Sequence, residues 1–124
     1  MCGIVGYIGN TKASEIILHG LKRLEYRGYD SAGISTIENN NIYTSKCKGK
    51  IKDLQLLIKN KNHNNSIGIG HTRWATHGEP TEENAHPHED NSRKFSLIHN
   101  GIIENHYSIK EYLMKENVKF SSDT

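Results

Sequence analysis

The chain begins MCGIVGYIG, which places a thiol at position 2, directly after the initiator methionine. The first residues of a domain are poorly ordered unless something holds them, so a purely structural thiol gains little at this position. If Met1 is removed, Cys2 carries a free α-amine, whose ordinary pKa of about 7.7–8.0 lets it accept the thiol proton. Cys2 is therefore a candidate nucleophile with its own general base. A chance cysteine is the alternative.

Acyl transfer through a thioester also requires donors aimed at a developing oxyanion, commonly a side-chain amide and a backbone N–H. The segment IHNGIIENH offers such a pair in Asn100 and Gly101, at the end of a predicted strand. Asn-Gly is also the commonest signal for a hairpin turn. The dipeptide alone leaves both interpretations open.

The segment HTRWATHG places Arg73 and Trp74 at the end of another predicted strand. A guanidinium group is the natural partner of a carboxylate, which indicates a substrate that carries one. The alternatives are a surface ion pair for Arg73 and a plug in the hydrophobic core for Trp74.

The chain has eight histidines and two cysteines, which raises the question of a metal site. His71, His77, His86 and His88 have spacings that could pair ligands, but no CxxC accompanies them and none of the spacings is a recognised zinc signature. No metal and no cofactor are therefore expected. Cys47 is expected to be an ordinary thiol at the end of a strand rather than a disulfide partner of Cys2.

Hydrophobic periodicity predicts the elements that must position these residues. Ile17, Leu21 and Leu24 follow the i, i+4, i+7 spacing of a helix over residues 13–26. Short segments rich in Ile and Val, bounded by Gly or Asn, predict strands. The predicted strands cover residues 2–8, 31–37, 41–47, 66–74 and 94–101, and two further helices cover residues 50–61 and 106–117, the second with Ile109, Tyr112 and Leu113 on one side.

Polar segments separate these elements. Asn39–Asn41 predicts a hairpin turn, and residues 60–66 predict a loop with no reason to be ordered. Residues 76–94 lack periodicity, and loops of this length in compact domains are usually functional or disordered. Short links between strands favour antiparallel pairing, so we expect mixed α and β structure with helices covering the sheets.

Length and composition set the class of protein. With 124 residues, 34% hydrophobic residues and a net charge of +2, the chain fits one polar folded domain. Its basic residues are spread along the chain, which gives no indication of a nucleic-acid partner. No apolar run approaches the ~20 residues of a membrane span, and no signal peptide is visible, so a cytoplasmic location is expected.

Four motifs occur together and in order: MCGIVGYIG, LEYRGYDSAGI, GHTRWATHGEPTEENAHPH and HNGIIENH. Together they resemble the glutaminase domain of the glutamine:fructose-6-phosphate aminotransferase family, within the class II glutamine amidotransferases. This resemblance implies an α+β fold of the N-terminal nucleophile hydrolase type, a four-layer α/β/β/α sandwich, of which only the N-terminal part is expected here. It further implies that residues 1–124 are a partial glutaminase domain, without its remainder and without the sugar-phosphate isomerase domains.

The resemblance also assigns roles to individual residues. Cys2 is similar to the nucleophile, and Asn100 and Gly101 are similar to the oxyanion hole. Arg73 resembles the ligand of the glutamine α-carboxylate, and Trp74 resembles the gate on the ammonia path. The loop that closes over glutamine contains Trp74 and His77, and the segment beside the nucleophile contains Arg27 and Gly28.

The implied activity is hydrolysis of L-glutamine through a Cys2 thioester. In the whole enzyme, expected to be a homodimer, the ammonia would aminate fructose 6-phosphate to glucosamine 6-phosphate. The resemblance places the aspartate that would bind the glutamine α-amino group beyond Thr124, so the segment alone is expected to have little activity. The alternative is a non-catalytic module that binds a synthase subunit or a regulator through an unpaired sheet edge.

Overall fold

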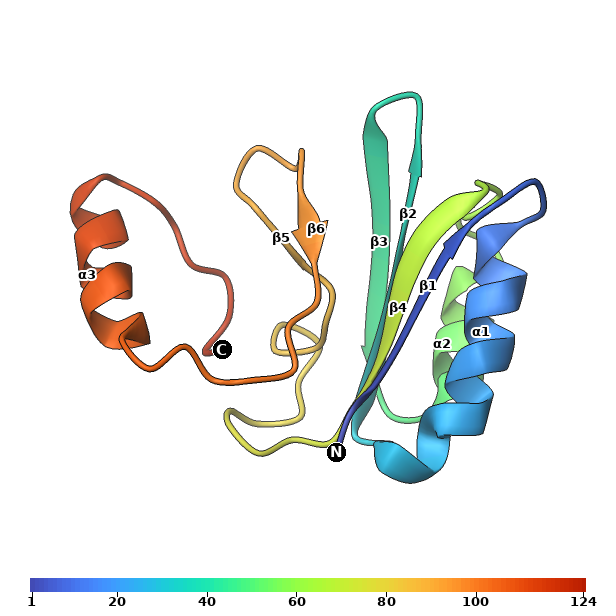
Figure 1. Cartoon of the computed structure of the whole chain (residues 1–124), viewed down its shortest axis with the longest axis horizontal. Coiled ribbons are helices and arrows are strands. Elements are labelled where there is room, and N and C mark those ends of the chain that lie inside the picture. The colour runs from blue at the N-terminus through green and yellow to red at the C-terminus, as the bar shows by residue number, and fades with distance from the viewer.

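The computed structural model describes all of residues 1–124 and is organised around one antiparallel sheet. Its four strands lie in the order β1-β4-β2-β3. They are β1 (Gly3–Ile8), β2 (Ser31–Glu38), β3 (Asn41–Lys48) and β4 (Ile67–Arg73). Two helices cover one face of this sheet, and a short hairpin and a third helix lie on the other side (Figure 1). The predicted order of α/β/β/α layers is confirmed.

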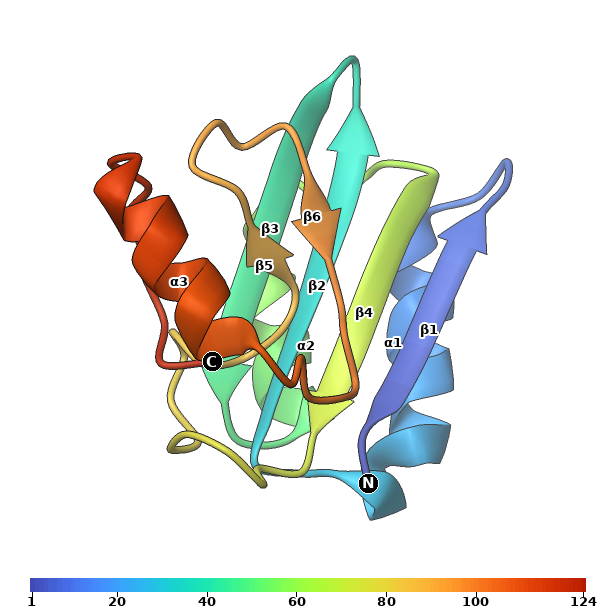
Figure 2. The ribbon, with the colours of Figure 1, turned by 60° about the vertical axis from the view of Figure 1, so that its left-hand side comes forward.

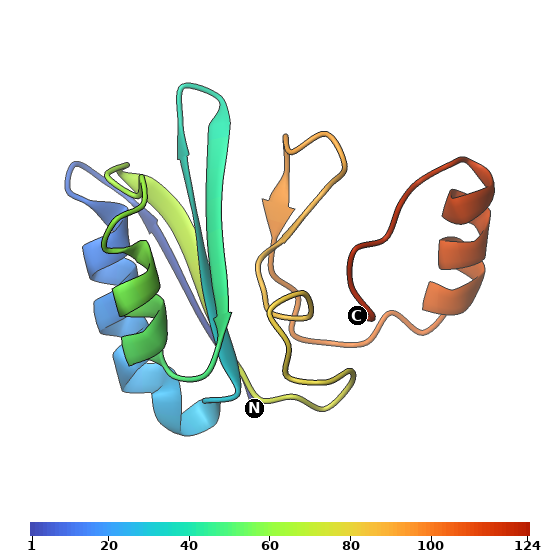
Figure 3. The same ribbon diagram turned by 180° about the vertical axis from the view of Figure 1, so that it is seen from behind.

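The covered face of the sheet forms the hydrophobic core. Helix α1 (Ala13–Leu24) and helix α2 (Ile51–Ile58) lie side by side there, as Figure 3 shows from behind. Their apolar stripes bury against the inward side chains of β2, which is the expected behaviour of amphipathic helices. The core consists of Ala13, Ile17, Leu18, Leu21, Ala32, Ile34, Ile51, Leu54 and Ile58.

The helices end where their sequences predict, within a few residues. The predicted helix over 13–26 stops at Leu24, and a 3-10 turn, η1 (Glu25–Arg27), follows. The first turn of α2 is satisfied by two carboxylates: Asp53 accepts from the Lys50 N–H at 2.8 Å, and Glu25 accepts from the Ile51 N–H at 3.0 Å. None of the three helices combines the length and the hydropathy needed to span a membrane.

The hairpin between β2 and β3 confirms the predicted turn. Asn39 and Asn40 both have positive φ, at 49° and 63°, and join strands that pair in full register from Ser31 with Lys48 to Glu38 with Asn41. Two central residues of positive φ match the right-handed twist of the strands, and asparagine tolerates that conformation.

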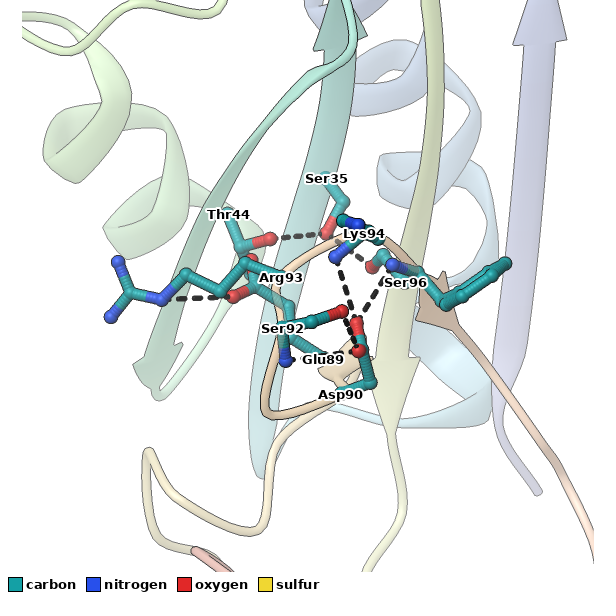
Figure 4. A network of polar contacts seen from close by, with 9 residues as sticks. Ser35, Thr44, Glu89, Asp90, Ser92, Arg93, Lys94 and Ser96 are labelled. Carbon is teal, nitrogen blue, oxygen red and sulfur yellow. Dashed lines mark hydrogen bonds and ion pairs between the residues drawn. The ribbon is translucent and has the colours of Figure 1, made fainter.

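The open face of the sheet is approached by a second, very short hairpin, β5 (His88–Glu89) and β6 (Ser96–Leu97), seen in front of β2 in Figure 2. The strand predicted over 94–101 is therefore wrong in extent. Its partner strand is only two residues long and follows Pro87, which has no N–H to extend the ladder. The Asp90 carboxylate closes the loop by accepting from the Lys94 and Phe95 N–H groups at 2.8 Å each (Figure 4).

Two other predicted segments form, but their burial differs from what their sequences suggest. Residues 60–66 are not a disordered loop, because His63 and Asn65 are each 2% exposed. Helix α3 (His106–Lys115) forms where predicted but buries no residue, so its apolar side finds no core in residues 1–124.

Candidate active site

The predicted nucleophile lies at the end of the central strand β4. The Trp74 N–H donates to the Cys2 sulfur with an N–S distance of 3.3 Å, and the sulfur lies 3.7 Å from the Trp74 carbonyl oxygen. The pairing of β1 with β4 explains this contact, since Gly3 is opposite Thr72 and the chain direction then brings Cys2 to the level of Arg73.

Strand alternation decides which side chains share the open face. A Cβ on Gly3 would lie 2.7 Å from the Leu24 Cβ, so Gly3 faces helix α1. Side chains alternate between faces, which places Cys2 on the opposite, open face. The cross-strand partners Ile4 and His71 also belong to that face, and so does Arg73.

Gly28 lets two backbones meet beside the nucleophile. A Cβ at this position would lie 2.5 Å from the carbonyl carbon of Arg73 and 2.7 Å from the Trp74 nitrogen. The Thr72 hydroxyl donates to the Gly28 carbonyl, and the Asp30 N–H donates to the Arg73 carbonyl at 3.1 Å. The Asp30 carboxylate also accepts from the Ala75 N–H at 2.7 Å, so this loop fixes the turn that follows β4.

Arg27 lies next to the amino terminus. Its Nη2 is 3.6 Å from the Met1 sulfur, and its Nε is buried without a hydrogen-bond partner. Met1 precedes Cys2 in the structure and is 74% exposed.

Arg73 holds the loop that follows the strand. It is only 5% exposed, and its guanidinium donates to the backbone carbonyls of His77, Gly78 and Glu79, the last at 2.8 Å. The surface ion pair considered from sequence is therefore wrong. The role of Arg73 as a carboxylate ligand stays a prediction, and the geometry adds a second task, the anchoring of the loop that carries His77.

Trp74 and His77 are on the surface of this loop. Trp74 is 44% exposed, so it is not a core plug, and its ring meets that of Tyr29 edge to face at 5.8 Å. The His77 ring lies 6.1 Å from that of His106 at the start of α3. Both residues are placed where an incoming ligand could reach them.

Asn100 and Gly101 follow β6 in a segment that pairs with no further strand, so the hairpin-turn alternative is wrong. The Asn100 Oδ1 lies 2.8 Å from the His71 Nε2, and His71 is two residues before Arg73 on the same face of β4. Cys2 and Gly28 thus contact the end of β4, where Arg73 and Trp74 lie, and Arg27 lies against Met1. Asn100 is linked to the same strand through His71, and Gly101 follows it. The catalytic and binding roles of the predicted site residues stay predictions.

Three histidines that the sequence raised as possible metal ligands, His71, His86 and His88, pack together and support this region. The His71 ring stacks on that of His86 with centroids 4.6 Å apart, and His86 lies against His88 at 4.4 Å. Burial lowers the pKa of His71 and His88 to about 4 each, and burial together with nearby positive charge lowers the pKa of His86 to about 3. No group of three or more His, Cys, Asp or Glu side chains has the arrangement of a metal site.

The sequence of the chain is similar to those of known aminotransferases. No protein-family model matches the chain. The chain is 56% identical over all of its 124 residues to the glutamine–fructose-6-phosphate aminotransferase (isomerizing) of Aquifex aeolicus, and 52% identical to that of Clostridium tetani. The similarity is to the amino-terminal part of these aminotransferases. It spans about a fifth of the length of these aminotransferases, namely 21% and 20%.

Solved structures agree with the assignment of the fold. The glutamine phosphoribosylpyrophosphate amidotransferase of B. subtilis, in complex with ADP and GMP, superimposes on the whole chain with a TM-score of 0.82 and 26% identity. A structure described as the allosteric regulatory enzyme of purine biosynthesis superimposes on 97% of the chain with a TM-score of 0.81. The chain covers 27% and 26% of these two structures. The predicted N-terminal nucleophile hydrolase fold is confirmed.

Proposed function

We propose that residues 1–124 provide the nucleophile of a glutamine amidotransferase, and that the whole protein transfers the released ammonia to fructose 6-phosphate. The observation that carries this proposal is the position of the Cys2 sulfur against the backbone of Trp74, beside the buried Arg73. The names of the aminotransferases that share about half of its residues supply the substrates. Those names favour an enzyme over the alternative of a non-catalytic binding module.

The proposed reaction begins once Met1 has been removed. The Cys2 α-amine takes the thiol proton, and the sulfur attacks the carbonyl carbon of the glutamine side-chain amide. The carbonyl electron pair moves onto oxygen, where Asn100 and the Gly101 N–H would stabilise it. The C–N bond then breaks, and nitrogen leaves as ammonia after receiving the proton. Water hydrolyses the thioester, which gives glutamate and regenerates the thiol.

The other residues would hold the substrate and its loop. A free guanidinium N–H of Arg73 can donate to the glutamine α-carboxylate, while the remaining donors keep residues 77–79 in place. Trp74 and His77 would cover the bound glutamine. Arg27 and Gly28 would shape the wall next to Cys2, as the close approach of Gly28 to the backbone of Arg73 indicates.

The test compares the two cysteines of the chain. We expect Cys2→Ala in the full-length protein to abolish formation of glutamate from glutamine. Cys47→Ala is the matched control, because burial raises the pKa of the Cys47 thiol to about 11 and keeps it protonated and unreactive at neutral pH. The proposal is wrong if the Cys2→Ala protein still makes glutamate at the rate of the unmodified protein.

A further inference from the structure

We propose that His71 is a positioning residue that fixes the orientation of the Asn100 amide, so that its NH2 group rather than its oxygen faces the reacting carbonyl. This inference rests on the proposed function, in which Asn100 is an oxyanion donor. It gives a task to a buried side chain that the mechanism above does not use.

The contact is specific because it is the only side-chain hydrogen bond that Asn100 makes. His71 is 1% exposed in the centre of the sheet, whereas Asn100 is exposed and lies outside any regular element. Their Nε2–Oδ1 distance of 2.8 Å is that of a good hydrogen bond. The hydrogen bond thus ties an exposed amide outside any regular element to a buried residue of β4.

The protonation state of His71 determines which arm of the amide it holds. A carbonyl oxygen can only accept, so a bond to Oδ1 requires the proton on Nε2. The Nδ1 atom is buried without a partner, and a proton there would leave a buried donor unsatisfied. The neutral ring, favoured by burial that lowers the pKa to about 4, therefore carries its proton on Nε2. The Asn100 NH2 group points away from the ring and remains available.

The histidine stack holds this ring in place. The planes of His71 and His86 are inclined by only 28°, and His86 rests on Gly33, the cross-strand partner of His71. A Cβ at Gly33 would lie 2.1 Å from the His86 carbonyl oxygen, so only glycine allows this approach. The His99 N–H donates to the His86 Nδ1 at 3.4 Å. The stacked pair therefore holds both the Asn100 side chain and the backbone one residue before it.

The arrangement predicts an effect on the chemical step. Removal of an oxyanion donor costs about 10²–10³ in kcat in a known example, and loss of its orientation costs at most as much. We therefore expect loss of the His71 contact to lower kcat by about 10–100-fold, with little change in KM for glutamine. Groups that act only in the transition state show this pattern.

The experiment uses two substitutions that differ in where they place an amide nitrogen. Glutamine at position 71 can bring its NH2 close to the position of Nε2, whereas the shorter asparagine reaches only the position of Nδ1. In the full-length protein we expect His71→Asn to show the loss in kcat. We expect His71→Gln to retain most of the kcat of the unmodified protein. His63→Gln is the control, since His63 is an equally buried histidine whose ring contacts Thr36 and Ser45 instead. It should keep kcat.

A second readout separates positioning from folding. The γ-semialdehyde analogue of glutamine accepts the Cys2 thiolate at its aldehyde carbon, which forms a C–S bond and moves the carbonyl electron pair onto oxygen. We expect His71→Asn to weaken binding of this analogue about 10-fold or more and to leave binding of the product glutamate unchanged. Equal weakening of both ligands, or an equal kcat in the Asn and Gln variants, would overturn the inference.

The unmodified protein provides a test that needs no variant. Nitrogen NMR of the ring should show the proton of His71 on Nε2, and a proton on Nδ1 would contradict the proposed orientation even if both variants fail to fold. If the unmodified protein neither hydrolyses glutamine nor binds the aldehyde, the proposed function itself fails. An active protein with the wrong His71 tautomer refutes only the positioning role.

Discussion

Single residues in this chain combine tasks that the sequence shows only in part. The chemical roles open to Cys2, Arg73 and Asn100 could be predicted from sequence, because their residue types and positions in the motifs are unusual. The burial of Arg73 against three carbonyls was not visible, since nothing in HTRWATHG says that the loop turns back over the strand. The place of His71 beside Arg73 could have been predicted from strand alternation, because the two residues are two apart and therefore share a face.

His63 shows why a polar stretch can be misjudged. Its segment, KNHNNS, has no periodicity, yet its Nδ1 lies 3.0 Å from the Thr36 hydroxyl and its Nε2 lies 2.8 Å from the Ser45 hydroxyl. These hydroxyls are on β2 and β3, far away in the chain. Local pattern cannot reveal such a network, because hydrogen-bond partners of this kind are set by the tertiary structure.

The burial of His63 predicts a pH dependence of stability. Burial, followed by the nearby Lys61 and Lys12, lowers the pKa of His63 from 6.5 to about 4. Below pH 6.5 the unfolded chain therefore binds a proton that the native protein does not bind. Stability should be complete above this pH and should fall toward pH 4, by up to about 1.4 kcal/mol per pH unit for one such group.

Urea unfolding of the protein at pH 7.5, 6 and 5 measures this dependence. The His63→Gln variant cannot take up the proton, so it should be less stable at pH 7.5 by about 1–3 kcal/mol but should lose less on acidification. The other buried histidines also have lowered pKa values, so part of the pH dependence of stability should remain in this variant. A variant with the same slope as the unmodified protein would show that His63 is not the titrating group.

At the scale of elements, β4 is the strand that organises the site. It pairs with β1 on one side and β2 on the other, and it ends in the turn that contacts Cys2. The sequence predicted this strand over 66–74, and Ile67–Arg73 confirms it. The short β5–β6 hairpin was beyond prediction, since two residues per strand leave no alternation to recognise.

Gly33 provides a test of how the segment that contains His86 packs on the sheet. A side chain at this position would collide with the His86 backbone at 2.1 Å, so we expect Gly33→Ala to lower the free energy of unfolding by about 1–3 kcal/mol. Gly6→Ala is the matched control on β1, because a Cβ there meets no atom within 4 Å. Its effect should stay within about 1 kcal/mol. Equal stability of the two variants in urea unfolding would refute the close packing.

At the scale of the molecule, the two faces of the sheet differ in how fully other elements cover them. The helical side buries a continuous core, whereas the other side leaves a hollow of about 550 Å³ lined in part by Ile67, Ile69 and Phe95. Helix α3 also exposes its apolar residues, with Tyr107 at 70% and Tyr112 at 63%. Periodicity correctly predicted that α3 is a helix, but it carries no information about which surface covers it.

The fold class could be predicted from the sequence for a physical reason. Helical and alternating patterns, together with short polar links, predict antiparallel strands covered by helices, and the four motifs specify the family in which that arrangement recurs. The strand order β1-β4-β2-β3 could not be predicted. It depends on β4 inserting between strands that precede it by many residues, a pairing that local pattern does not encode.

The most direct test of the central claim is the capture of the covalent intermediate. The full-length protein is mixed with glutamine, quenched in acid within the first turnovers and digested, and its peptides are analysed by mass spectrometry. We expect a glutamyl group as a thioester on Cys2, at the amino terminus exposed by loss of Met1, and none on Cys47. Glutamate formed at full rate with no adduct on Cys2, or by a chain that retains Met1, would contradict the account.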